Sequence, residues 1–526
     1  MSFFADEWGF VVARRGLSAG TLLTPHGPNL VVFPLLVWKL FLKIFGGGSY
    51  VPFRLLAAFG VASVGLALGV ACRAQWGRWW GLAPVLLFVT LGPAAASLLW
   101  PFQIGYTLAV AFGLCGLIAL GRGEPRADVI ACVSLIISLG SESQGIGFVV
   151  GAALVVILSG DWLRRSWTVL VPALLYLLWY ATYGHQHSES HLSLWGTSLS
   201  YGVQSLSATA GAVVGLSSFS PQTGTLDMTF GVPIAVALIA AIAVAAWRGW
   251  RPQPIFWAAA ATLLVLWFAS SVSNYGAFSR PPNGTRYLLT NAALLFVCVC
   301  AALPKPRLAG GGLIVALIVL SIVSATNADQ FSLQRSAFVS AAQAQWAELG
   351  ALDLMRGTVS PTYDPGVVDP NLANIQAAPF FSAKDDFGLK AASVAEIARQ
   401  PETTRQAVDR ILAPNELSLT PAAAAPRSSA ARITVLGGNP GRQRGCVVIA
   451  AAALDLNLSP GSVTITTSSR YPTTVAAARF ATGYGYAVGT VPVGSTWLLH
   501  VAADRAPQLP WRVSLTGTGS RVCPVR

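Results

Sequence analysis

Charged residues are scarce in this sequence of 526 residues, because Asp, Glu, Lys and Arg together make up only 10% of it. Soluble domains carry about 25% charged residues. Hydrophobic residues make up 54%, so the composition excludes an ordinary soluble domain and indicates a polytopic membrane protein. The net charge of +13 does not indicate a nucleic-acid partner. Many of the basic residues lie in short loops between apolar runs, where they orient a membrane protein.

The seven cysteines include no CxxC pair and no Cys/His spacing of the kind that binds zinc. Five of them lie in or beside apolar runs, and we interpret these as small hydrophobic side chains: Cys72, Cys115, Cys132, Cys298 and Cys300. Cys446 and Cys523 lie in the polar C-terminal part, and we predict a disulfide between them if that part faces an oxidising compartment. Two free thiols are the alternative.

Long apolar runs are abundant, and a helix that crosses a membrane needs about 20 such residues. Eight runs qualify: 51–72, 80–98, 103–121, 168–183, 230–247, 255–272, 287–303 and 308–325. Residues 127–159 contain two shorter runs, separated by the polar stretch GSESQG at 140–145. Each short run makes roughly 21 Å of helix, less than the ~30 Å hydrocarbon core, and such a pair is tolerated where it lines a cavity walled by protein. We therefore predict an α-helical membrane domain with about ten crossings.

Pairs of basic residues follow every second apolar run if the short pair counts as two crossings. These pairs are Arg73 and Arg78, Arg122 and Arg126, Arg164 and Arg165, Arg248 and Arg251, and Lys305 and Arg307. Cytoplasmic loops carry an excess of Lys and Arg, so we predict that these loops face the cytoplasm. The outward segments are then 1–50, the turn near 100–103, 140–145, 185–228, 273–287 and everything after about residue 327. The apolar segment 28–45 fits an interfacial helix better than a crossing, which would place residues 1–27 inside.

From residue 327 the composition changes from apolar to mixed. The patterns at 333–355 and 388–412 indicate amphipathic helices, the second interrupted near Pro401. Alternating runs between Gly and Pro turns then predict a β-sandwich, whose aromatic residues either fill its core or stack on sugar rings. The expected parts are a transmembrane domain at 1–326, an extracytoplasmic helical segment at 327–419, a linker at 420–431 and an extracytoplasmic β-sandwich at 432–526. This organisation predicts a multi-pass protein of the plasma membrane.

The N-terminal part carries a further pattern, with DEWGFVVARRG at 6–16, TPHGPN at 24–29, an apolar segment, and VPFRLLAAFG at 51–60. This order resembles the first outer loop and following helix of the GT-C superfamily of membrane glycosyltransferases. There an Asp or Asp-Glu pair precedes a His-Pro-like segment, an interfacial helix and an Arg-bearing start of the next crossing. His26, Pro28 and Arg54 occupy these places, so the resemblance makes His26 and Arg54 candidate substrate-binding residues. It covers about 70 residues well and the remaining membrane part in layout only.

The resemblance implies an inverting enzyme, similar to mannosyl- and arabinosyltransferases, that takes a sugar from a polyprenyl-phosphate donor. An acceptor hydroxyl must lose its proton as it attacks the anomeric carbon, and a carboxylate can act as the general base. By the resemblance Asp6 has this catalytic role, with Glu7 as its helper or substitute. On the residues alone, both acids could equally be a helix cap or solvated charge.

The departing lipid phosphate requires cationic or hydrogen-bonding partners. Arg280, Arg286 and Tyr287 stand at the start of an apolar run, and an Arg-Tyr pair at that place also resembles many GT-C members. Arginine grips phosphate bidentately, and the alternative for both arginines is snorkelling to lipid headgroups. Glu142 and Gln144, in the break of the short pair, correspond by layout to the region that lines the donor cavity. Many relatives have a Lys there and this chain has none, so a simple polar turn is the alternative.

A histidine-rich stretch, GHQHSESH at 184–191, is the candidate metal site. His185, His187, Glu189 and His191 alternate, which on a strand would place all four on one face. Imidazole and carboxylate together bind divalent cations. Some GT-C enzymes use such a metal, for which Mg²⁺ and Mn²⁺ are the candidates, and many do not. A solvated loop after a crossing is the alternative.

Residues 1–10 carry acids in place of the basic n-region of a signal peptide, so no cleavable signal is expected. GT-C proteins usually have a crossing before the acidic loop, whereas Asp6 stands almost at the start of this chain. Either the true start lies upstream, or the short N-terminus is translocated without that helix.

We therefore expect a glycosyltransferase that moves a sugar from a polyprenyl-phosphate donor to a cell-envelope glycan or glycolipid acceptor on the outer face of the bilayer. A composition rich in Ala, Gly and Arg is typical of high-GC genomes and points to an actinobacterial envelope. Two other classes of protein are alternatives. A non-catalytic envelope scaffold would leave Asp6 and Arg286 without a role. A transporter or flippase predicts polar residues at helix midpoints and symmetric halves, and the sequence shows neither.

Overall fold

The structure is a computed structural model of the chain. It describes residues 3–185, 191–221, 223–274, 280–307, 310–422, 429–438, 440–443, 445–449, 453–467, 471–506 and 509–525. The chain forms two compact units, and we name them by their content. The helical unit contains Arg14–Phe45 and Tyr50–Val339, and the mixed unit contains Met1–Ala13, Gly46–Ser49 and Ser340–Arg526.

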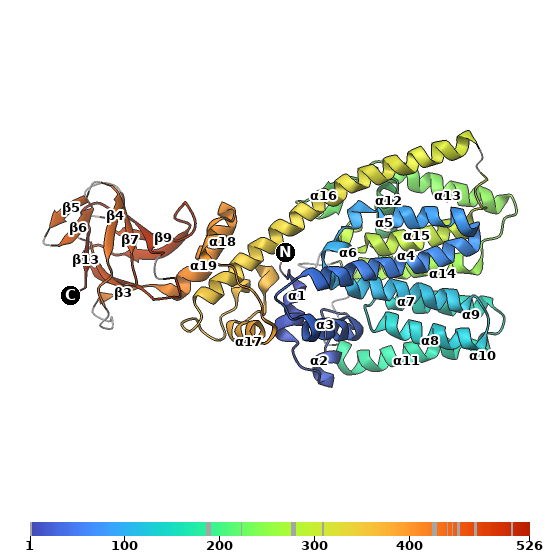
Figure 1. Cartoon of the computed structure of the whole chain (residues 1–526), viewed down its shortest axis with the longest axis horizontal. Helices are drawn as coiled ribbons and strands as arrows, with labels where there is room; N and C mark the ends of the chain where they lie inside the picture. The colour runs from blue at the N-terminus through green and yellow to red at the C-terminus, as the bar shows by residue number, and fades with distance from the viewer. Residues whose placement is uncertain are drawn as a thin grey trace. The chain divides into compact units, whose positions relative to one another are not determined.

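The helical unit is built from long apolar helices. The described residues, with α16 that begins in this unit, contain six helices long and apolar enough to cross a membrane. They are α4 (Val51–Trp80), η3 with α7 (Pro101–Gln103 and Ile104–Leu120), α11 with η4 (Trp167–Trp179 and Tyr180–Gly184), α14 (Pro254–Val272), η7 with α15 (Thr285–Tyr287 and Leu288–Ala302) and α16 (Gly311–Leu354). Helices α4, α7, α14 and α15 run side by side (Figure 1) and share one apolar core, which includes Leu68, Leu114 and Ala292. The expected membrane character is confirmed at this level, and the number of crossings stays a prediction.

The two short apolar runs form helices α8, Pro125–Leu139, and α9, Gly145–Leu158, on either side of the polar turn. Helix α8 packs on α7, and α9 packs on α14. At the end of α8 away from this turn, Arg165 Nη2 donates to Asp128 Oδ1 at 2.6 Å, and both side chains are buried. Arg165 also donates to the carbonyl of Leu120 at the end of α7. Arg165, which the sequence analysis interpreted as an orientation signal, therefore also fixes the start of α8 against the end of α7.

The apolar run at 80–98 does not form one helix, which is a difference from the expected crossing. It is divided into α5 (Leu82–Val89), η2 (Gly92–Ala94) and α6 (Ala96–Leu99). Gly92 and Pro93 stand at the break, and proline has no N–H to continue a helix. A Cβ on Gly92 would lie 1.6 Å from the carbonyl oxygen of Asn327, so α16 packs directly against this backbone.

A second difference lies at residues 185–228, which were expected to be an outer loop. They contain helix α12, Ser198–Val213, which packs against α13 (Gly231–Trp247) and α14, and the short strands β1 (Phe219–Ser220) and β2 (Thr225–Leu226). Helix α12 is rich in Ser, Thr, Gly and Ala, which pack closely but give little hydropathy signal. The expected interfacial helix is present as α3, Val32–Phe45, preceded by α2, Ala19–Leu23. Its position at a membrane surface stays a prediction.

The mixed unit contains the two expected helical stretches and further helices that were not expected, among them α17 (Ala377–Phe387). The predicted amphipathic helix at 333–355 is the end of α16, so the expected boundary at residues 326–327 falls inside one helix. Pro401 precedes α19, which confirms the predicted interruption. The remaining helical elements are α1 (Asp6–Trp8), η1 (Gly9–Ala13), η8 (Pro365–Val367), η9 (Pro370–Leu372), α17 (Ala377–Phe387), α18 (Val394–Ala398) and α19 (Glu402–Glu416).

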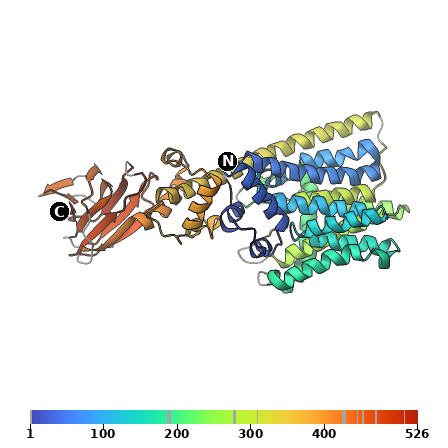
Figure 2. The same cartoon turned by 60° about the horizontal axis from the view of Figure 1, so that its bottom comes forward.

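The C-terminal strands form two antiparallel sheets (Figure 2) with the orders β10-β9-β12-β7-β4 and β3-β11-β8-β13-β6-β5. The strands are β3 (Leu417–Pro421), β4 (Ile433–Gly437), β5 (Pro440–Gln443), β6 (Cys446–Ile449), β7 (Ala453–Leu458), β8 (Gly461–Thr466), β9 (Thr473–Ala478), β10 (Tyr486–Val491), β11 (Thr496–Val501), β12 (Trp511–Thr516) and β13 (Arg521–Pro524). The predicted strands are therefore present, and the sandwich packing of the sheets stays a prediction. Strand β3 pairs with β11 and takes up the first two residues of the expected linker.

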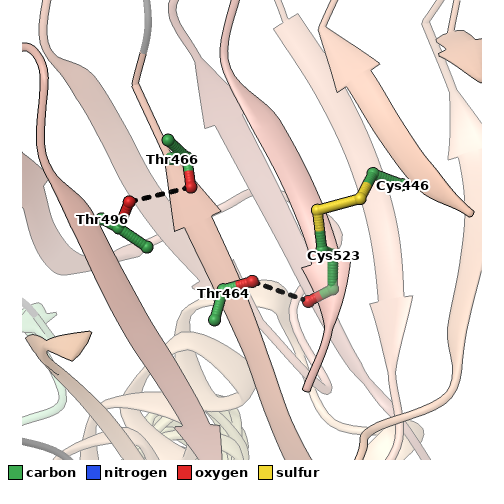
Figure 3. Close-up of a disulfide and its surroundings, with 5 residues drawn as sticks. All are labelled: Cys446, Thr464, Thr466, Thr496 and Cys523. Atoms are coloured by element: carbon green, nitrogen blue, oxygen red, sulfur yellow. Dashed lines mark hydrogen bonds between the residues drawn. A yellow bond between two sulfur atoms is a disulfide. The ribbon is translucent and has the colours of Figure 1, made fainter. Parts of the chain in front are cut away.

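Cys446 and Cys523 form the predicted disulfide (Figure 3), with their Cα atoms 4.4 Å apart. The bond joins β6 to its ladder neighbour β13 and closes a sequence separation of 77 residues. Thr464 of β8 donates to the carbonyl of Cys523 at 3.2 Å on the other side of the same strand. The five other cysteines are free thiols, as expected.

A cluster of buried charge joins α19 to the sheets, and we call it the Arg479 cluster: Arg479, Glu416, Asp504 and Trp511. Arg479 Nη1 donates to Glu416 Oε2 at 2.8 Å and to Asp504 Oδ2 at 2.7 Å. Its Nε and Nη2 donate to two backbone carbonyls. Trp511 Nε1 donates to Glu416 Oε2 at 2.8 Å, and its ring is 1% exposed, so this tryptophan belongs to the core.

Candidate functional site

The helical unit contains a cavity of about 210 Å³ with many polar lining residues, which we call the polar cavity. Its wall comes from the turn between α8 and α9 with the start of α9, from α7, α11, η4 (Tyr180–Gly184), α12, α14 and α15, from the segment before α15, and from Pro28 and Asn29. The lining residues are Pro28, Asn29, Tyr106, Glu142, Ser143, Gln144, Ile146, Tyr176, Tyr180, Tyr201, Ser205, Leu266, Trp267, Ala269, Ser270, Ser273, Arg280, Arg286, Tyr287, Thr290 and Asn291. The structure thus brings together Glu142, Gln144, Arg280, Arg286 and Tyr287 from two distant parts of the sequence.

Glu142 and Gln144 are held by the polar turn itself. Glu142 Oε2 accepts from Ser143 Oγ at 3.0 Å and from the Gln144 N–H at 2.9 Å, just before the start of α9. Gln144 Oε1 accepts from Thr290 Oγ1 of α15 at 2.7 Å. A Cβ on Gly145 would lie 2.5 Å from the Leu139 nitrogen, so the turn is tight enough to require glycine there. The GSESQG sequence therefore builds a rigid, buried polar wall.

The segment that carries Arg280 is fixed by hydroxyl groups of α12. Tyr201 donates to the carbonyl of Arg280 at 2.9 Å, and Ser205 donates to the carbonyl of Pro282 at 2.8 Å. Asn283 Nδ2 donates to the carbonyl of Leu226 in β2 at 2.7 Å. These bonds hold an irregular segment beside the cavity, and α12, which the sequence did not reveal, supplies two of them.

Arg286 and Tyr287 lie in η7, the first turn before α15. The Arg286 guanidinium lies over the Trp100 ring, 5.2 Å from its centroid. Tyr287 and Tyr106 of α7 have ring centroids 6.0 Å apart. An aromatic face under a guanidinium holds the cation in place while leaving its N–H groups directed sideways. This arrangement suits an arginine that binds an anion.

The charged side chains among the described lining residues are Glu142, Arg280 and Arg286. Burial raises the pKa of Glu142, against the opposing effect of its two hydrogen bonds and of the two arginines. With Glu142 ionised the three groups sum to +1, and with Glu142 protonated they sum to +2. Either state complements an anion, and a phosphodiester carries one negative charge. Arginine is suited to this ligand because its planar fork matches phosphate oxygens.

Aromatic side chains form much of the remaining wall, and sequence reasoning missed them. Tyr106, Tyr176, Tyr180 and Trp267 stand in apolar runs, where they resembled ordinary core or lipid-facing residues. Tyr201 stands in α12, within the stretch that was expected to be an outer loop. The sequence contains no periodic signal that separates a tyrosine facing a cavity from one facing lipid. Such rings offer an apolar face and a polar edge, which is the combination that sugar rings bind.

The predicted catalytic acids belong to the mixed unit and differ from each other. Glu7 is fully buried, and its Oε2 accepts from the Phe4 N–H at 2.9 Å. Asp6 is half-buried in the same short helix α1. Glu7 therefore closes the turn that it stands in, whereas the Asp6 carboxylate is the more accessible of the two.

Two further predicted binding residues lie in the helical unit outside the cavity lining. His26 forms a backbone bridge with Asn29, and its ring lies 5.2 Å from that of Phe102. Its neighbours Pro28 and Asn29 are the residues of this segment that line the cavity. Arg54 is half-buried in the first turn of α4.

The candidate metal site is described only in part. His187 and Glu189 lie outside the described residues, and the exposed His185 and His191 flank them. Among the residues that the structure does describe, no group of three or more His, Cys, Asp or Glu side chains is placed to hold a metal ion. Binding of Mg²⁺ or Mn²⁺ by this stretch therefore stays an untested prediction.

Comparison with known proteins gives little further information. No protein-family model matches the chain, and no curated protein matches it. Among solved structures, the chain is similar to the crystal structure of ArnT from Cupriavidus metallidurans bound to undecaprenyl phosphate, with a TM-score of 0.43 and 15% identity. The similarity covers 69% of this chain and 78% of that chain. A TM-score of 0.43 is too low for this likeness to assign a function.

Proposed function

We propose that the protein is a membrane glycosyltransferase that transfers a sugar from a polyprenyl-phosphate donor to a cell-envelope glycan or glycolipid on the outer face of the plasma membrane. The observation that supports this most is the polar cavity, in which Arg280, Arg286, Glu142 and several tyrosines meet. The N-terminal resemblance to GT-C enzymes supports it independently, because it rests on about the first 70 residues.

The charges of the cavity fit the phosphate of such a donor. Arg280 and Arg286 outnumber the single carboxylate of Glu142, so a phosphodiester would leave the site close to neutral. Charge-assisted hydrogen bonds to phosphate contribute about 1.5–3 kcal/mol each. The tyrosines and Trp267 offer faces for the sugar ring, and Gln144 and Asn291 offer amides for its hydroxyl groups.

In the proposed reaction Asp6 is the general base. The acceptor hydroxyl gives its proton to the Asp6 carboxylate as its oxygen attacks the anomeric carbon from the face opposite the phosphate. The bond between the anomeric carbon and the phosphate oxygen breaks, and the electron pair leaves with the lipid phosphate, where Arg280 and Arg286 stabilise it. This displacement inverts the anomeric centre. Glu7 is the less suitable base, because its carboxylate already accepts the Phe4 N–H.

The remaining expectations belong to the same proposal. The C-terminal sheets and their disulfide are extracytoplasmic, as a bond stable in an oxidising compartment requires. The envelope is of an actinobacterial kind, and the sugar is transferred by a mannosyl- or arabinosyltransferase-like enzyme. A requirement for a divalent metal is tested by adding EDTA to the assay below.

The test measures transfer from a panel of polyprenyl-phosphate sugars to envelope glycan fragments by the purified protein. Asp6→Asn is expected to lower the rate about 10²- to 10⁴-fold, the contribution of a general base. Glu7→Gln is expected to lower it less, and Asp329→Asn, which removes an exposed acid of α16, is the matched control. Wild-type rates in Asp6→Asn with loss in Glu7→Gln would move the base to Glu7. Absence of transfer from every donor by the wild type would favour an envelope scaffold.

A further inference from the structure

The backbone immediately before Asp6 is held in a conformation that alanine rarely adopts. Ala5 has φ 47° and ψ −123°, which glycine tolerates and which costs another residue about 1–3 kcal/mol. Such a conformation persists only where the surrounding contacts over-determine the chain. The contacts that hold Ala5 therefore decide where the Asp6 carboxylate lies.

A buried glutamine of α16 makes such a contact. The Ala5 N–H donates to Gln345 Oε1 at 2.8 Å, and Gln345 is only 2% exposed. Gln345 Nε2 donates to Asp369 Oδ2 at 3.2 Å. The other oxygen of Asp369 accepts from the backbone and side-chain N–H groups of Asn371. Because Ala5 offers a donor and Asp369 an acceptor, the orientation of the Gln345 amide is set from both sides.

Aromatic contacts in the same unit fix the rest of the N-terminal segment. The Phe3 and Trp8 ring centroids lie 5.5 Å apart, and Trp8 lies 6.1 Å from Phe380 of α17. Phe3 and Trp8 are both almost fully buried. These rings hold residues on either side of Ala5, and Gln345 acts on the backbone of Ala5 itself.

We propose that Gln345 is a positioning residue for Asp6, an inference that rests on the proposed role of Asp6 as the base. Without the amide oxygen the Ala5 N–H loses its acceptor, and the strained conformation loses its support. The backbone then relaxes toward ordinary φ values and carries the Asp6 carboxylate away from its working position. A displacement of about 1 Å is enough to cost about 100-fold in rate. The loss falls on kcat, since Asp6 acts in the transition state and does not bind the donor.

The test compares Gln345→Leu with Gln343→Leu, which changes an exposed glutamine two residues away on α16. Gln345→Leu is expected to lower kcat about 10- to 100-fold with the donor KM within about twofold, and Gln343→Leu to change neither. Adding Ala5→Gly to Gln345→Leu is expected to restore most of kcat, because glycine adopts the Ala5 conformation without support. Hydrogen exchange of residues 3–10 is expected to be faster in Gln345→Leu and unchanged in Gln343→Leu.

The outcomes separate this inference from the proposed function. Wild-type kcat in Gln345→Leu, with transfer lost in Asp6→Asn, overturns the positioning role and leaves the base in place. A loss of kcat that Ala5→Gly does not relieve also overturns it, because the damage then does not pass through Ala5. If Asp6→Asn keeps transfer, the proposed base fails, and the positioning role in catalysis is overturned with it. Faster exchange at residues 3–10 in Gln345→Leu then shows only that Gln345 holds this backbone.

Discussion

Two groups of charged side chains among the described residues, the Arg479 cluster and the lining of the polar cavity, differ in what lies between the charges. In the cluster, one guanidinium directly contacts the carboxylates of Glu416 and Asp504 and two backbone carbonyls. In the cavity, two arginines and one carboxylate surround an open volume of about 210 Å³. The first arrangement joins parts of the fold, and the second has room and charge for a ligand.

The comparison shows that burial and charge alone do not identify a binding site. Both groups contain buried acids whose pKa is raised by burial, Glu142 in the cavity and Glu416 in the cluster. They differ in the sign of the excess charge, which is positive in the cavity and negative in the cluster, and in the open space between the groups. Substitutions that remove charge should therefore change stability in one group and ligand affinity in the other.

The largest expected effect on stability comes from Arg479→Leu. It leaves Glu416 and Asp504 buried without their shared cation, and breaking such a pair costs about 3–5 kcal/mol. Calorimetry of the full chain in detergent should show the mixed unit unfolding at a clearly lower temperature. Arg521→Leu, on the exposed side of β13, is the matched control and should change the transition little. Equal transitions for the two variants would contradict a stabilising role for the cluster.

Removal of the disulfide should have the next largest effect. Replacing Cys446 and Cys523 together by serine releases a loop with a separation of 77 residues and should cost about 2–4 kcal/mol. The same calorimetric transition is measured, with and without a reducing agent. If the double variant and the reduced wild type unfold like the oxidised wild type, the bond does not form or does not stabilise the sheets.

A smaller effect should appear as a pH dependence of the mixed unit. Burial, together with the neighbouring Asp504, raises the pKa of Glu416 to about 7, from an ordinary value of 4.5, against the opposing charge of Arg479. The folded state therefore binds this proton more tightly than the unfolded state. The stabilisation that this proton provides is fully present below pH 4.5 and is lost as the pH rises through about 7. The loss in the free energy of unfolding is on the order of 1–3 kcal/mol. Urea unfolding at several pH values should show this fall.

Glu416→Gln sharpens that experiment. The amide cannot ionise, so the variant should lose most of the pH dependence between pH 4.5 and 8 while remaining folded. Glu402→Gln, which changes an acid of the same helix, is the control. Its stability should fall as in the wild type when the pH rises through 7. A Glu416→Gln variant with the wild-type slope would assign the pH dependence to another group.

Much of the fold could be predicted because apolar runs of sufficient length are themselves the signal for membrane helices. The apolar run at 80–98 was wrongly predicted to form one crossing helix. Hydropathy does not register the break at Gly92 and Pro93, where α16 packs directly on the backbone. Helix α12 was missed for the opposite reason. Its small and hydroxyl-bearing residues pack well in close contact, but they carry little hydropathy.

The polar part of the candidate site could be predicted better than its aromatic part. Glu142 and Gln144 interrupt the apolar region at 127–159, and Arg280 and Arg286 stand just before the apolar run at 287–303. Each of these polar residues is therefore conspicuous in the sequence. Tyr106 and the other lining tyrosines are conspicuous only once helix packing shows which face they lie on. The contact between Ala5 and Gln345 spans 340 residues, and no local pattern could have revealed it.

The role of the polar cavity is tested by measuring lipid binding to the purified wild type, Arg280→Gln and Arg286→Gln. The ligands are a polyprenyl phosphate and the matching polyprenol, which lacks the phosphate, and Arg335→Gln is the exposed control. We expect the wild type to prefer the phosphate, and each cavity substitution to weaken phosphate binding about 10- to 100-fold at unchanged thermal stability. Equal affinity for phosphate and alcohol, or binding that neither substitution alters, would contradict the assignment of the polar cavity to a lipid phosphate.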